Sequence, residues 1–140
     1  MGTRVFVDTN VLVYLYDKSE VAKHARAREL MLDDSLDLVI SAQVLNEFYV
    51  TVTRKIATPM SIESAQSAVE SLAELEVVPV TRNLVLDALA TGADHKLSHW
   101  DALVVEAASR AGTQMLYSED MATGATIRGV ELVNPFAASD

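Results

Sequence analysis

Short apolar runs alternate with longer helix-forming stretches along the chain, and this alternation constrains the fold more than any other feature. Five such runs, rich in valine, leucine and isoleucine, predict strands at residues 4–7, 36–40, 77–80, 115–117 and 130–133. Strands that alternate with helices indicate a parallel sheet with helices on both faces. We therefore expect an α/β fold whose central, mostly parallel sheet has four to five strands.

The stretches between these runs predict helices, at residues 10–16, 20–32, 42–56, 61–75, 81–93 and 98–110. A serine or threonine stands at the start of most of them, where its side chain can accept a hydrogen bond from the first helical turn. These residues are Ser41, Ser61, Thr81 and Ser98. The 140 residues contain no repeat or linker, so we expect one domain over 1–140, with a frayed tail at 135–140.

The composition excludes several kinds of site. With no cysteine and only three histidines, the chain has no disulfide and is a poor candidate for zinc. It shows no signal peptide and no apolar stretch that would span a bilayer, so we expect a soluble, cytoplasmic protein without membrane contact. The net charge of −9 argues against a basic surface for nucleic acid. Acids that converge on one pocket can nevertheless bind phosphate through a divalent cation.

Four carboxylates fall where such a pocket would lie. Asp8 directly follows the first strand, and Asp120 comes three residues after the fourth. Glu47 lies in the second turn of the helix after strand two, and Asp101 in the first turn of the helix before strand four. Ligands of open α/β sheets bind beyond the carboxyl ends of the strands. Oxygen ligands suit Mg²⁺ or Mn²⁺, so we expect a site for one of these ions.

Each acid also has a purely structural interpretation. Asp101 stands three residues after Ser98, which is the spacing of a capping box. Glu47 is compatible with a surface position, although no basic residue lies at helical-pair spacing. Asp8 is compatible with the start of a turn, and Asp120 with a solvated loop. The joint pattern, rather than any single residue, favours a functional site.

Four segments carry a resemblance to a known family: VFVDTNVLVY at 5–14, SAQVLNEFY at 41–49, LSHWDALVVEAASRAG at 97–112 and LYSEDM at 116–121. In this order and spacing they resemble the PIN-domain family, and in particular the VapC-type toxins of bacterial toxin–antitoxin pairs. The likeness covers nearly the whole chain. It implies a three-layer α/β/α fold and an endoribonuclease that depends on Mg²⁺ or Mn²⁺.

The resemblance also implies roles for individual residues. It assigns four to the acidic, metal-binding and catalytic cluster: Asp8, Glu47, Asp101 and Asp120. It assigns three polar residues to the support of these carboxylates and of metal-bound waters: Thr9, Asn10 and Ser118. Glu119 is adjacent to Asp120 and competes with it for the fourth acidic position.

The family further implies a cognate antitoxin protein and a homodimer. Our mechanistic hypothesis is hydrolysis of an RNA phosphodiester by a metal-activated water. Such a reaction leaves 3′-hydroxyl and 5′-phosphate ends. Two alternatives stay open: a PIN-like binding module without activity, and another Mg²⁺-dependent phosphoryl-transfer domain of the receiver type. The receiver type would place a second acid where this chain has Asn10.

Other residues near the expected site have two interpretations. His95, Lys96 and His99 precede Asp101 and are candidates for substrate binding, but a polar loop explains them equally well. Trp100 opens an apolar helix, so we predict a core anchor rather than a residue that stacks on a base. Basic residues at positions 23, 24, 26 and 28 are candidates for contact with RNA, but we favour a solvated helix face.

Overall fold

Six strands form one sheet in the computed structural model, which describes residues 2–137. They are β1 (Thr3–Val7), β2 (Leu36–Ser41), β3 (Glu76–Val78), β4 (Met115–Tyr117), β5 (Thr126–Ile127) and β6 (Val130–Val133). The order is β3-β2-β1-β4-β6-β5, and all neighbours are parallel except β5 and β6. The expected mostly parallel sheet is confirmed.

The expected number of four to five strands was wrong, because it left out β5. This strand has only two residues, too few to form an apolar run, and it pairs antiparallel with β6. The loop between the two strands consists of Arg128 and Gly129, with φ of 54° and 81°. A two-residue hairpin loop with two positive φ angles matches the right-handed twist of its strands. Backbone geometry rather than side-chain pattern therefore defines this strand.

Six helices of the described residues alternate with these strands, close to where the sequence predicts them. They are α1 (Thr9–Val13), α2 (Val21–Leu32), α3 (Ala42–Arg54), α4 (Ile62–Leu72), α5 (Arg82–His95) and α6 (His99–Arg110). The four predicted N-caps are confirmed: the side chains of Ser41, Ser61, Thr81 and Ser98 each accept a hydrogen bond from the backbone three residues on. No helix within residues 2–137 is long and apolar enough to cross a bilayer.

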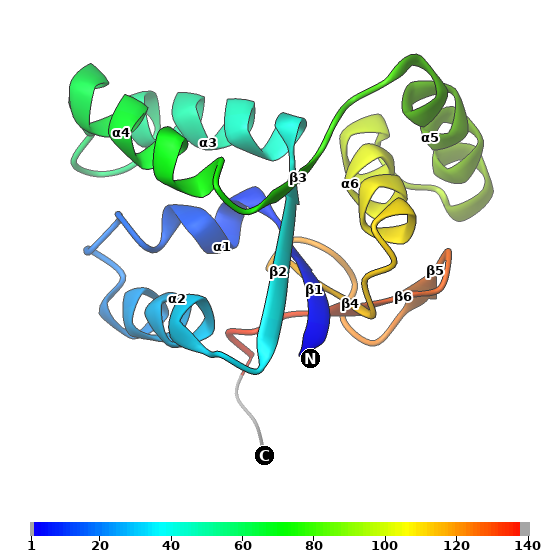
Figure 1. The fold of residues 1–140 in the computed structure, drawn as a ribbon, viewed down its shortest axis with the longest axis horizontal. Coiled ribbons are helices and arrows are strands. Elements are labelled where there is room, and N and C mark those ends of the chain that lie inside the picture. The colour runs from blue at the N-terminus through cyan, green and yellow to red at the C-terminus, as the bar shows by residue number, and fades with distance from the viewer. Residues whose placement is uncertain (1, 138–140) are drawn as a thin grey trace.

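Helices lie on both sides of the sheet. In Figure 1, α2 lies to the left of β1 and β2, and α5 and α6 lie to their right. The core is densest around the central strand, where Val5, Phe6 and Val7 are almost completely buried. β1 is flanked by β2 and β4, so it has neighbours at both edges and packing on both faces. A central parallel strand of this kind is expected to be apolar throughout.

The strand order creates a crevice beside β1. The chain moves from β1 to β2 on one side, and β4 lies on the other side. Asp8 N donates to Tyr117 O at 3.0 Å, so the β1–β4 ladder continues to the end of both strands. Such a switch point, at the carboxyl ends of parallel strands, is where ligands bind in open sheets. In Figure 1, α1 and α3 begin where β1 and β2 end, at this same edge.

A buried glutamate fixes the helix that carries Asp101. Glu106 of α6 is 1% exposed. Its carboxylate accepts hydrogen bonds from Thr91 Oγ1 of α5 and, at 2.9 Å, from Arg128 Nε of the β5–β6 turn. A buried carboxylate is costly unless it is paired and hydrogen-bonded, so these contacts hold α5, α6 and the hairpin together.

The C-terminal segment is ordered further than the sequence suggested. Pro135 is buried, and its carbonyl accepts a hydrogen bond from Arg26 Nε at 3.0 Å. The ring of Phe136 meets that of Tyr14 edge to face, with centroids 5.1 Å apart. A frayed tail that begins at residue 135 is therefore wrong for 135–137, and 138–140 lie outside the described residues.

Replacement of Thr91 by Val tests the role of Glu106. The substitution keeps the shape but removes a donor to a buried carboxylate, so we expect a loss of about 1–3 kcal/mol in the free energy of unfolding. Urea denaturation measures this loss. Thr126→Val, at an exposed position, is the matched control and should change stability by less than about 0.5 kcal/mol. Equal effects of the two substitutions would contradict this role.

Candidate functional site

A pocket of about 370 Å³ opens at the carboxyl edge of the sheet, and all four predicted acids line it. Asp8 comes from the end of β1, Glu47 from α3, Asp101 from α6 and Asp120 from the loop after β4. These segments are far apart in the sequence. The fold therefore brings the four acids together, as the positions of the strand ends predicted.

Asp8 lies deepest and is held by two hydrogen bonds. It is 7% exposed, Thr9 N donates to its Oδ1 at 2.8 Å, and Ser118 Oγ donates to its Oδ2 at 2.8 Å. Burial raises the pKa of Asp8 to about 6, although both hydrogen bonds oppose the shift. The negative charges of Glu47 and Asp101 add to the increase. At neutral pH the ionised form of Asp8 is therefore destabilised by its surroundings.

The carboxyl groups of Glu47 and Asp101 also have raised pKa values. Burial is the main reason that the pKa of each carboxyl is raised. The charge of Asp101 further raises the pKa of Glu47, and the charge of Asp120 that of Asp101. Gln43 Nε2 donates to Glu47 Oε1 at 3.1 Å and to the carbonyl of Trp100 at 3.2 Å, so it links α3 to α6 across the pocket.

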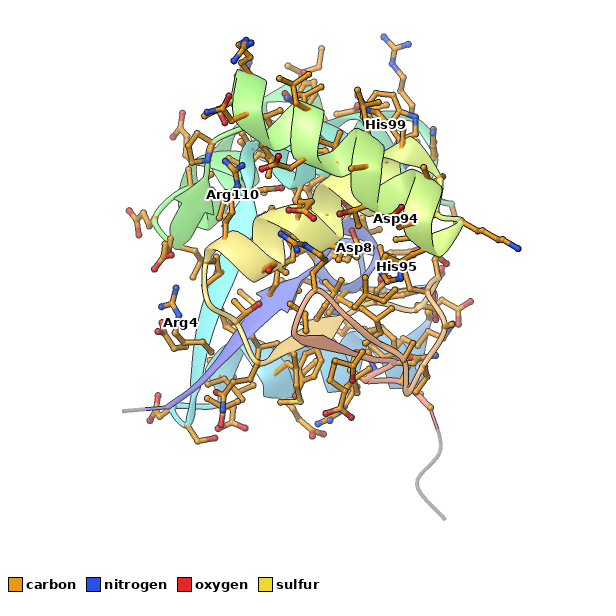
Figure 2. The ribbon with its side chains drawn as sticks, turned by 90° about the vertical axis from the view of Figure 1, so that its right-hand side faces the viewer. Arg4, Asp8, Asp94, His95, His99 and Arg110 are labelled. Atoms are coloured by element: carbon orange, nitrogen blue, oxygen red, sulfur yellow. The ribbon has the colours of Figure 1, made fainter. Side chains whose placement is uncertain are left out.

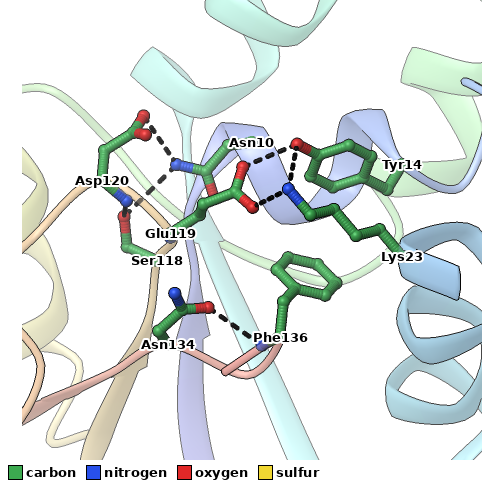
Figure 3. A network of polar contacts seen from close by, with 8 residues as sticks. All are labelled: Asn10, Tyr14, Lys23, Ser118, Glu119, Asp120, Asn134 and Phe136. Atoms are coloured by element: carbon green, nitrogen blue, oxygen red, sulfur yellow. Dashed lines mark hydrogen bonds and ion pairs between the residues drawn. The ribbon is translucent and has the colours of Figure 1, made fainter. Parts of the chain in front are cut away.

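Asn10 and Ser118 position the fourth acid (Figure 3). Asn10 Nδ2 donates to Asp120 Oδ2 at 3.0 Å and to Ser118 Oγ at 3.3 Å. Asp120 N donates to Ser118 Oγ at 3.3 Å, while this hydroxyl donates to Asp8. Asn10 and Ser118 therefore contact the carboxylates through their side chains, and Thr9 contacts Asp8 through its backbone N.

Glu119 points away from the pocket although it is adjacent to Asp120. Its carboxylate accepts a hydrogen bond from Tyr14 Oη at 2.6 Å and pairs with Lys23 Nζ at 2.5 Å (Figure 3). Its backbone N donates to Asn10 Oδ1 at 3.1 Å. Of the two candidates for the fourth acidic position, only Asp120 lines the pocket. Lys23 belongs to α2, whose basic side chains were predicted to be solvated; this one instead makes a structural contact.

The lining is acidic and lacks positive charge. Within residues 2–137, no lysine, arginine or histidine lines this pocket, whereas a fifth acid, Asp17, does. Asp17, whose Oδ1 also accepts hydrogen bonds from Ser19, was not among the predicted site residues. Gln43 was not predicted either, although its position one turn before Glu47 was a usable signal. Nothing in the lining neutralises the carboxylates.

Three residues proposed for substrate binding lie outside the pocket lining. His95 ends α5 and His99 begins α6 (Figure 2). Lys96 follows α5 with a φ of 56°. The structure does not place their side chains among the lining residues. The prediction for Trp100 was wrong: its side chain is 63% exposed and lines the pocket instead of the core. Trp100 lies in the first turn of α6, and the continuous buried stretch of this helix begins only at Ala102.

The raised pKa of Asp8 predicts that the effect of Asp8→Asn on stability depends on pH. Because the folded-state pKa is raised, the unfolded state loses its proton first, and stability falls as pH rises from about 4 to about 6. Asparagine removes this penalty. The experiment is done with a chelator present. We expect the difference in the free energy of unfolding, Asp8→Asn minus wild type, to increase by about 1.4 kcal/mol between pH ~5 and pH ~8. Urea denaturation at the two pH values measures it, and a pH-independent difference would contradict the raised pKa.

Comparisons with known proteins agree with this fold. The PIN-domain family model matches residues 5–122. Among solved structures, the chain is similar to VapC20 of Mycobacterium tuberculosis, a toxin that cleaves the sarcin–ricin loop. The sequence identity is 23% and the TM-score 0.67, over 83% of this chain and 89% of that chain.

Two assemblies are also similar. A toxin–antitoxin complex from Klebsiella pneumoniae matches with 20% identity and a TM-score of 0.70, over 94% of this chain and 97% of that chain. VapBC2 of Rickettsia felis, bound to a DNA fragment from its promoter, matches with 18% identity and a TM-score of 0.61, over 84% and 89%. No curated protein sequence gives a significant match. Since the family model covers most of the chain, from β1 to the loop that carries Asp120, the chain belongs to the PIN-domain family.

Proposed function

We propose that this chain is an endoribonuclease that depends on Mg²⁺ or Mn²⁺ and serves as the toxin of a toxin–antitoxin pair. The observation that carries the proposal is the convergence of four carboxylates on a pocket whose lining, within residues 2–137, holds no positive charge. Such a cluster is unfavourable by itself: burial raises the pKa of Asp8 to about 6, and the charges of Glu47 and Asp101 add to the increase. A divalent cation removes this penalty and attracts phosphate.

The residues of the pocket fit a hard cation. All candidate ligands are oxygen atoms, and Thr9 Oγ1, buried beside them, has no hydrogen-bond partner within the described residues. Within residues 2–137, no three His, Asp or Glu side chains are grouped to bind one ion directly. A bound ion would thus take few protein ligands and keep several waters, as Mg²⁺ usually does.

We assign different roles to the four acids. Asp8 and Asp101 would hold the ion directly, and Glu47 and Asp120 would hold waters at the site. When bound, the cation polarises the phosphate and makes water a stronger acid. Glu47, whose pKa is raised by burial, is suited to accept a proton from the attacking water. Water attacks the phosphorus, the bond to the 3′-oxygen breaks, and the products carry 3′-hydroxyl and 5′-phosphate ends.

The toxin role is supported by the kind of proteins that share the fold. VapC20 is a toxin that cleaves the sarcin–ricin loop, and two further neighbours are the assemblies described above. We therefore propose a cognate antitoxin as the protein partner, a homodimeric toxin and a place in the cytoplasm. The net charge of −9 suits a basic partner.

The alternatives are less well supported. A receiver-type domain needs a lysine at the phosphate site, and no lysine of the described residues lines the pocket. An inactive PIN-like module would not need all four carboxylates in one pocket with their supporting hydrogen bonds.

Cleavage of end-labelled structured RNA tests the proposal. We expect discrete cuts in Mg²⁺ or Mn²⁺, no cuts in EDTA, and no detectable cuts by Asp8→Asn in either metal, because the variant loses a direct ligand. The fold of this variant should be intact, since the asparagine side-chain oxygen can still accept a hydrogen bond from Thr9 N. The ends of the products are then identified chemically.

Two results would contradict the proposal. One is full cleavage by Asp8→Asn or in EDTA, which would indicate a contaminant or another site. The other is a product with a 2′,3′-cyclic phosphate, which would mean that the ribose hydroxyl, not water, is the nucleophile.

The adjacent acids of the loop after β4 provide a matched pair of variants. Asp120→Asn should lower cleavage by about 10–100-fold, because it removes a carboxylate that holds water at the site. Glu119→Gln should lower it less than about tenfold, because this side chain only ties the loop to Tyr14 and Lys23. Single-turnover rates with saturating metal measure both effects. A larger loss of rate in Glu119→Gln than in Asp120→Asn would reassign the fourth acidic position to Glu119.

A further inference from the structure

Trp100 stands out among the exposed apolar side chains by its position. Several others, such as Val21, Leu32 and Leu89, are also exposed, so exposure alone marks no site. Trp100 is the only one of these large exposed side chains, within residues 2–137, that lines the acidic pocket. It immediately precedes Asp101, at the beginning of α6. Its ring therefore lies at the rim of the proposed reaction site, next to a proposed ligand.

The structure holds the backbone of this tryptophan in place. Its carbonyl accepts a hydrogen bond from Gln43 Nε2, and the same amide nitrogen donates to Glu47. Gln43 thus fixes the indole-bearing turn relative to a pocket carboxylate. The indole itself is largely exposed and contacts the ring of His99 edge to face, with centroids 5.7 Å apart. Only the side-chain torsions of Trp100 have to be ordered when it binds a ligand.

The electrostatics of the pocket explain what this indole contributes. A nucleotide that enters must bring its phosphate toward carboxylates, and no basic side chain of the described residues lines the pocket itself. The cation at the proposed site accounts for the phosphate alone. Affinity for the rest of the nucleotide has to come from uncharged contacts. Stacking on an aromatic ring provides it for every base, because every base has a π-face.

We propose that Trp100 forms a base-binding subsite, on which the base of the nucleotide next to the scissile phosphate stacks. The proposal rests on the function proposed above and adds a residue that selects how the RNA enters. A base within a duplex is covered by its neighbours, so only an unstacked nucleotide offers a free face to the indole. Trp100 therefore favours loops and unpaired segments, whatever their sequence.

The chain contains one tryptophan, so its fluorescence reports on this subsite alone. The wild-type protein with Mg²⁺ is titrated with adenosine 5′-monophosphate and, in parallel, with ribose 5-phosphate. Neither probe contains a phosphodiester bond, and the two differ only in the base. We expect the nucleotide to quench the fluorescence in a saturable, Mg²⁺-dependent manner, and ribose 5-phosphate not to quench it. The quenching must exceed the collisional quenching that the nucleotide causes with free N-acetyltryptophanamide. Equal responses to the two probes would overturn the proposal.

Cleavage kinetics on a single-stranded RNA give the second readout. Trp100→Leu should raise KM about tenfold or more with little change in kcat, whereas Trp100→Phe should largely retain the wild-type KM. Leu89→Ala, at a position of α5 that is 56% exposed and outside the pocket, is the control and should match wild type. A wild-type KM for Trp100→Leu would overturn the proposal.

The two readouts separate this proposal from the proposed function. If the wild type cleaves RNA but the nucleotide does not quench its fluorescence, the stacking subsite is wrong and the nuclease stands. If the nucleotide quenches in a Mg²⁺-dependent manner but no RNA is cleaved, the subsite stands and the nuclease is wrong.

Discussion

The hydrogen bond from Ser118 to Asp8 is the contact on which the rest of the site depends. It joins the ends of β1 and β4, the two strands that border the switch point of the sheet. Asp8 is buried there, and its pKa is raised to about 6 by burial and neighbouring acids. The fold therefore places a carboxylate where burial and neighbouring acids destabilise its anion, and the hydrogen bond from Ser118 offsets part of this effect. Such a placement is typical of functional sites, because it has a cost that folding alone does not require.

The remainder of the architecture supplies the partners of this carboxylate. α3 brings Glu47, and α6 brings Asp101 together with the pocket-facing Trp100. The position of α6 in turn depends on Glu106, a buried acid that is not part of the pocket lining. The acidic composition and the proposed affinity for a nucleic acid are thus compatible, because five acids line a pocket in which a cation would reverse their effect on phosphate.

The sequence alone predicted the parallel sheet, the N-caps and the four clustered acids, because strand periodicity, capping residues and strand ends are local signals. It did not predict what depends on long-range geometry. The pairing of Glu119 with Lys23 requires α2 to lie beside the loop after β4. The exposure of Trp100 depends on which part of the first turn of α6 faces the sheet edge. β5 is defined by the turn at Arg128, not by an apolar run.

The most direct test of the central claim is the number of protons released when Mn²⁺ binds. Calorimetry in buffers of different ionisation enthalpy measures this number. A cation at Asp8 must displace the proton of a carboxyl whose pKa is about 6. We predict release of about half a proton near pH 6 and almost none near pH 8. Binding without proton release near pH 6, or no binding at all, would contradict a metal site built on Asp8.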